Sequence, residues 1–86
     1  MNNWRTMIAE EMKNHGESFE DVISCTLSDA GLDAIFDDMY GSPAGEPFTL
    51  WAKSRVYFPV TYDGAEMVSS VSRFPDGKPT QHVGGY

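Results

Sequence analysis

The sequence predicts an α+β domain in which two or three short N-terminal helices pack on a three-stranded antiparallel β-meander. Apolar residues recur at helical spacing in the first half, aromatic and β-branched residues dominate the second, and an Asp-Gly pair separates two apolar runs there. The 86-residue length fits a single domain. We divide it into an acidic helical half (1–40), a β-meander (47–73) and an irregular C-terminal segment (74–86) rich in Pro and Gly.

The first helix is predicted over residues 4–14. Asn2 or Asn3 is placed to cap its N-terminus, and Gly16 favours a stop because glycine adopts the left-handed conformation without steric cost. Four apolar residues at i, i+3, i+4 and i+8 give this helix one buried stripe. They are Trp4, Met7, Ile8 and Met12.

A second and a third helix are expected before the loop at 41–45. Ser18 and Asp21 have the spacing of a capping box, which predicts a short helix through Val22 and Ile23. Residues 24–28 favour helix poorly and would end it. Four further apolar residues at helical spacing predict the third helix, capped by Ser28 or Asp29. They are Leu32, Ile35, Phe36 and Met39.

The Asp63-Gly64 pair predicts a hairpin with a type I′ turn, since both residues tolerate positive φ. That turn sets the register, so Tyr62 faces Ala65 and each earlier residue follows in step. Pro59 cannot donate a ladder hydrogen bond, which requires a bulge or an outward-pointing nitrogen there. We expect one face of the strand to lie against the helices and to consist of Val56, Phe58, Val60 and Tyr62.

The charge of the chain is uneven. Its net charge is −7, and residues 1–46 hold ten acidic and two basic side chains. This excess disfavours binding to nucleic-acid phosphates or anionic membranes. One interpretation is a solvated face; the other is a surface that docks on a basic protein. The candidate acidic face is Glu20, Asp21, Asp33, Asp37 and Asp38.

No catalytic, metal or cofactor signature stands out, so we expect a non-enzymatic protein without a cofactor. Cys25, the single cysteine, follows apolar residues and is interpreted as a core residue. Asp33, Asp37 and Asp38 could hold a divalent cation, yet they lack the spacing of a calcium loop. The start of the chain lacks the pattern of a signal peptide, and no apolar run is long enough for a membrane span. We therefore expect a cytoplasmic location.

Trp51 and Tyr57 form a candidate aromatic face. If Val56 and Phe58 face the core, Tyr57 points to the other side of the sheet, beside Trp51 or Leu50 depending on the register of the loop. Exposed Trp and Tyr often dominate protein interfaces. The alternative is that the C-terminal segment or a second subunit covers this face.

The second half also carries a family resemblance. The segment that runs Trp51-x-x-x-Arg55-Val56-Tyr57-Phe58-Pro59-Val60-x-Tyr62-Asp63-Gly64-x-Glu66-x-Val68 resembles short uncharacterised proteins of tailed bacteriophages and prophages. The resemblance implies an accessory protein acting in a bacterial cytoplasm. Our hypothesis is a protein that binds and modulates another protein, with an anti-CRISPR or other anti-defence inhibitor as the concrete version. The alternative is a structural, assembly or self-associating phage protein.

Overall fold

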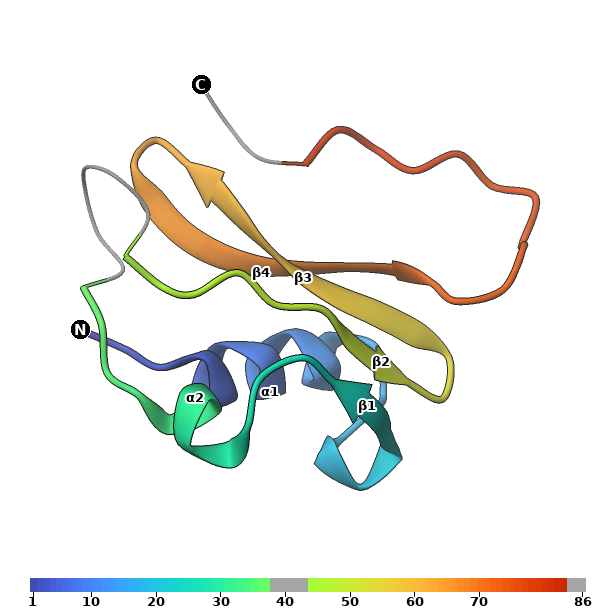
Figure 1. Cartoon of the computed structure of the whole chain (residues 1–86). Coiled ribbons are helices and arrows are strands. Elements are labelled where there is room, and N and C mark those ends of the chain that lie inside the picture. The colour runs from blue at the N-terminus through green and yellow to red at the C-terminus, as the bar shows by residue number, and fades with distance from the viewer. Residues whose placement is uncertain (38–43, 84–86) are drawn as a thin grey trace.

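The computed structural model describes residues 1–37 and 44–83, and it has the α+β architecture that the sequence predicts. Four strands form one antiparallel sheet in the order β1-β2-β3-β4, one strand more than predicted. Helices α1 and α2 lie on one side of this sheet (Figure 1). The elements are α1 (Trp4–Asn14), the 3₁₀ turn η1 (Phe19–Asp21), β1 (Val22–Cys25), α2 (Asp29–Asp33), β2 (Leu50–Ala52), β3 (Arg55–Tyr62) and β4 (Ala65–Ser72).

Helix α1 forms as predicted, with the predicted stripe buried. The Asn3 side chain accepts a hydrogen bond of 2.8 Å from the Thr6 N–H, which satisfies a first-turn donor. Gly16 follows the helix at φ +72°, in the left-handed region where glycine is favoured. The stripe of Trp4, Met7, Ile8 and Met12 is buried in the core.

The predicted second helix is wrong beyond its first turn. Asp21 accepts a 3.0 Å hydrogen bond from the Ser18 N–H, as the predicted capping box requires, but only the turn η1 follows. Val22–Cys25 is strand β1, which pairs antiparallel with β2. β-Branched Val22 and Ile23 suit a strand, and this long-range pairing outweighs the local helix signal.

The third helix is shorter than predicted. Ser28 caps α2 by accepting from the Gly31 N–H at 3.1 Å, but the helix ends at Asp33. Leu32 is buried as expected, whereas Ile35 is 64% exposed. Phe36 forms an isolated bridge with Asn2 and packs on Trp4, with ring centroids 4.7 Å apart. Met39 lies outside the described residues.

The β3–β4 hairpin has the predicted register. Asp63 and Gly64 have φ angles of 50° and 81°, and Tyr62 pairs with Ala65. A two-residue turn makes this first pair hydrogen-bonded, and the pairs then alternate. The Pro59↔Val68 pair is therefore of the non-hydrogen-bonded kind. The Pro59 nitrogen points away from β4, and the pairing of β3 with β2 ends before it, at Tyr57, so neither ladder needs its missing donor.

The face assignment of β3 is wrong. Tyr57 pairs with Leu50, which places both side chains on the helix side of the sheet. Both are fully buried there, together with Ala52. Val56, Phe58, Val60 and Tyr62 consequently point to the other side. The helix side of β3 also carries Arg55 and Thr61, so the apolar alternation favours the opposite side. The pairing with β2 decides which side is inside.

Trp4 is the centre of the core beside α2. Its ring lies between Phe36 and Phe48, with the Phe48 centroid 4.9 Å away, and its indole N–H donates to the Glu46 carbonyl at 3.0 Å. Gly45 passes so close that a Cβ there would lie 2.5 Å from the indole. Only glycine fits this close approach without rearrangement.

Candidate functional site: the surfaces of the sheet and the helical layer

The predicted aromatic face is corrected by the structure. Tyr57 is a core residue on the helix side of the sheet and is not part of any exposed surface. Trp51 pairs with Val56 and lies on the opposite side, where it is 37% exposed. The two residues therefore do not form one surface.

The side of the sheet away from the helices is apolar. We call it the open face and define it by Trp51, the outward residues of β3 and the apolar outward residues of β4. Tyr62 is 53% exposed and Met67 43% exposed, and the aliphatic residues between them are half-buried. Within the described chain, the element that packs across the sheet is α1, and it lies on the other side (Figure 1). The open face consists of Trp51, Val56, Phe58, Val60, Tyr62, Met67 and Val71.

The open face carries no charged side chain, because both strands place theirs on the helix side or in the turns. Ala65 and Ser69 complete the outward positions of β4 and are small. Contiguous apolar surface of this kind is uncommon on monomeric proteins and marks interaction sites. Chemically, the face suits association with another apolar surface rather than catalysis.

Part of the predicted acidic face gathers around Arg5 on α1. The Arg5 guanidinium donates to Asp29 at 3.0 Å and to Asp33, and these hydrogen bonds raise the pKa of Arg5. Arg5 also lies over the Phe19 ring, 5.3 Å from its centroid, which brings the neighbouring Glu20 to the same region. Sequence reasoning missed Arg5 and Asp29, because only the packing of α2 against α1 brings them together.

The remaining acidic candidates differ in their surroundings. Asp21 accepts a hydrogen bond from the Ser18 N–H and forms an ion pair of 3.4 Å with Lys53. Asp37 is exposed, and Asp38 lies outside the described residues. In the part of the chain that the structure describes, no three His, Cys, Asp or Glu side chains gather as a metal site would require. The cation site that was considered for Asp33, Asp37 and Asp38 is not tested, since Asp38 lies outside the described residues.

Three other carboxylates hold the fold together, and sequence reasoning did not identify their partners. Glu17 accepts from the Tyr57 hydroxyl at 2.6 Å and from the Ser54 N–H at 3.0 Å. Glu66 is buried and accepts from the N–H groups of Ala44 and Gly45 at 2.8 and 3.1 Å. The third, Glu11, accepts from the Ser70 hydroxyl at 3.0 Å. The bonds of Glu11 and Glu17 join the helical half to the sheet, whereas those of Glu66 join β4 to the segment that precedes β2. Two carboxylates of the acidic half are therefore engaged within the fold.

Burial and hydrogen bonding shift the pKa of two of these groups. Burial raises the pKa of Tyr57, and its hydrogen bond to Glu17 raises it further. Burial also raises the pKa of Glu17, but the hydrogen bonds from Tyr57 and Ser54 outweigh it, so the net pKa is lowered. Cys25, interpreted from the sequence as a core residue, is half-buried and packs against the core.

Comparison with protein-family models, with curated proteins and with solved structures finds no significant match. No helix in the described part of the chain is both long and apolar enough to cross a membrane.

Proposed function

We propose that this protein is non-enzymatic and acts by binding another protein across the open face of its sheet. The observation that carries the proposal is the charge-free apolar surface around Trp51, Tyr62 and Met67. Burying such surface stabilises a complex by roughly 25 cal/mol per Å² before the costs of association. Exposed Trp and Tyr are the side chains that most often dominate such interfaces.

The proposed partner is a different protein rather than a second copy. Two copies each carry a net charge of −7 and repel one another, whereas a basic partner is attracted. The carboxylates around Arg5 and the exposed Glu20 add to this attraction from the helical layer. The resemblance to phage proteins supports a partner in a bacterial cytoplasm.

The specific form of the proposal is an anti-CRISPR or other anti-defence inhibitor whose partner has a basic nucleic-acid-binding surface. Exposed charge attraction is screened by salt, so complex formation should weaken as ionic strength rises. A charge reversal at Glu20 should also weaken the complex, because it removes an exposed negative charge. Glu20 lies outside the ion pairs of Arg5, so those pairs are kept.

The test is photo-crosslinking in bacterial cells from single positions. A photoreactive residue at Tyr62 probes the open face, and one at the exposed Thr6 on α1 is the matched control. We expect one heterologous protein to be captured from Tyr62 and not from Thr6. Capture of only a second copy would replace this proposal with the self-associating alternative, and no capture, or equal capture from both positions, would contradict it.

A further inference from the structure

Strand β4 is a long edge of the sheet. It is last in the order β1-β2-β3-β4, runs for eight residues and pairs with β3 without a bulge. Natural proteins usually blunt such edges with Lys, Pro or bulges, because their backbone groups are open to pairing. β4 has no Lys, Pro or bulge, and the protection it does carry is limited to one inward-pointing buried charge, Glu66, and to the C-terminal segment 74–83 beside its end.

The register shows which backbone groups of β4 point outward. Because Tyr62 and Ala65 form a hydrogen-bonded pair, every second residue of β4 bonds to β3. The N–H and C=O groups of Val68, Ser70 and Ser72 therefore point away from the sheet. On that side the Ser70 carbonyl accepts from the Arg55 guanidinium at 3.0 Å, while β4 has no strand partner among the described residues.

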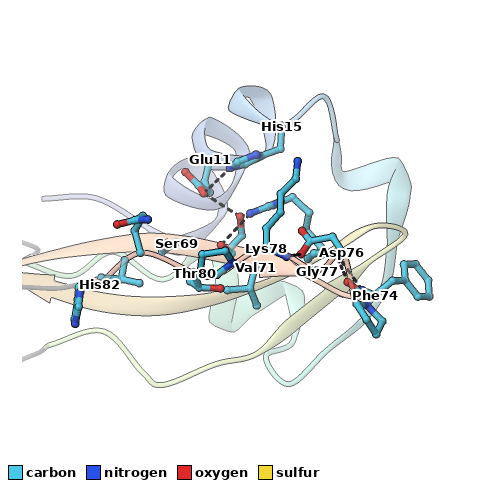
Figure 2. Close-up of a pocket in the computed structure, with 17 residues that line it drawn as sticks. Glu11, His15, Ser69, Val71, Phe74, Asp76, Gly77, Lys78, Thr80 and His82 are labelled. Carbon is cyan, nitrogen blue, oxygen red and sulfur yellow. Dashed lines mark hydrogen bonds and ion pairs between the residues drawn. The ribbon is translucent and has the colours of Figure 1, made fainter.

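A groove follows this edge, with α1 as its wall. One hollow of about 310 Å³ lies between Met7, Glu10 and Asn14 of α1 and Met67 and Val68 of β4. A second, of about 540 Å³, lies between α1, the end of β4 and the C-terminal segment 74–83. Glu11 lines both hollows, and Figure 2 shows Glu11 and His15 on α1 facing the second one.

We propose that this groove binds an extended peptide segment of the partner as a fifth strand beside β4, with a Lys or Arg facing Glu10 and Glu11. The inference rests on the proposed function and adds a second contact at the sheet edge. The outward N–H and C=O groups of Val68 and Ser72 require an extended backbone, as in other cases of strand addition. The edge from Met67 to Ser72 spans about 17 Å, which calls for roughly six peptide residues.

Both the charge and the space of the groove favour an extended basic peptide over a second copy of the chain. Glu10 is exposed on the groove wall, and Glu11 is oriented by His15 and the Ser70 hydroxyl, each at 3.0 Å. Glu10 and Glu11 line the hollow beside Met67 and Val68, whereas Arg55 and Lys78 line the second hollow. A basic side chain of the peptide therefore complements the first hollow. A second copy fits poorly, because paired edge strands lie about 4.8 Å apart whereas helices pack about 8–10 Å apart. Two copies joined through β4 would bring their α1 helices together, since α1 packs against β4.

The test uses a displayed library of short linear peptides, selected on the wild-type chain. Val68→Pro removes an outward N–H without removing a bond to β3, and Val68→Ala is the control for lost packing. We expect selected peptides to carry a Lys or Arg and to bind Val68→Pro at least about tenfold more weakly than Val68→Ala, as the loss of one backbone hydrogen bond implies. Equal binding to the two variants would overturn the proposal.

Two further measurements test the proposal without depending on the folding of Val68→Pro. In the wild-type chain, a selected peptide should slow hydrogen exchange at the Val68 and Ser70 amides. Glu10→Lys should weaken its binding, since Glu10 is exposed on the groove wall. Failure to enrich any peptide, or protection confined to the open face, would overturn the groove proposal. If crosslinking from Tyr62 still succeeds in that case, the proposed function stands and only the groove is rejected.

Discussion

The Tyr57 hydroxyl donates a 2.6 Å hydrogen bond to the Glu17 carboxylate, 40 residues earlier in the chain. This bond satisfies the polar end of Tyr57, whose side chain is fully buried in the core. It also joins the loop after α1 to the sheet, where Tyr57 of β3 pairs with Leu50 of β2. The bond is therefore a link between the helical layer and the sheet.

Tyr57→Phe should destabilise the fold by about 2 kcal/mol, because it removes a buried hydrogen bond to a charged group. Tyr62→Phe is the matched control, since the Tyr62 side chain is exposed on the open face. Its change in unfolding free energy should stay within about 0.5 kcal/mol. Urea unfolding followed by tryptophan fluorescence measures both; equal effects would show that the Glu17 bond contributes little.

The same pair predicts how stability depends on pH. The pKa of Glu17 is lowered in the folded chain, so its contribution is present above its usual pKa of 4.5 and is lost as pH falls through the lower folded value. The pKa of Tyr57 is raised, so its contribution is present below its usual pKa of 10.0 and is lost as pH rises above it.

Unfolding free energies measured across the pH range check both the acid and the alkaline loss of stability. We expect Tyr57→Phe to flatten the alkaline decline and Glu17→Gln to flatten the acid decline. An alkaline decline that is unchanged in Tyr57→Phe would assign the titration to other groups.

Glu66 fixes the chain where it returns to the core at Ala44 and Gly45. Glu66→Ala should cost about 2 kcal/mol of stability and speed hydrogen exchange at these two amides, because both lose a charged acceptor. Glu46→Ala is the control, since its exposed side chain lies on the same segment and changes little. If the two variants unfold at the same urea concentration, the Glu66 contacts do not stabilise the segment.

Local signals in the sequence predicted α1 and the hairpin correctly. Asn3, Gly16 and the Asp63-Gly64 turn act within a few residues, so their effect is readable without the rest of the fold. β1 and the side on which Tyr57 lies depend on pairing with β2, which is distant in the sequence. No local pattern contains that information.

The candidate site was predictable only in part, for the same reason. Trp51 was identified as an exposed aromatic residue, and the structure places it on the outer side of the sheet. Tyr57 was assigned to the same surface, because the apolar alternation of β3 was read on the wrong side. The carboxylates of Glu17 and Glu66 have partners from distant segments, which residue type alone does not reveal.

The most direct test of the central claim measures binding by Trp51→Glu to the protein that is captured from Tyr62. Trp51 lies on the open face and outside the buried core, so the variant should keep its unfolding free energy within about 1 kcal/mol. Its affinity for the captured protein should fall at least tenfold, about 1.4 kcal/mol, because a charge replaces an apolar anchor. Unchanged affinity in a folded Trp51→Glu variant would contradict the claim that the open face is the binding surface.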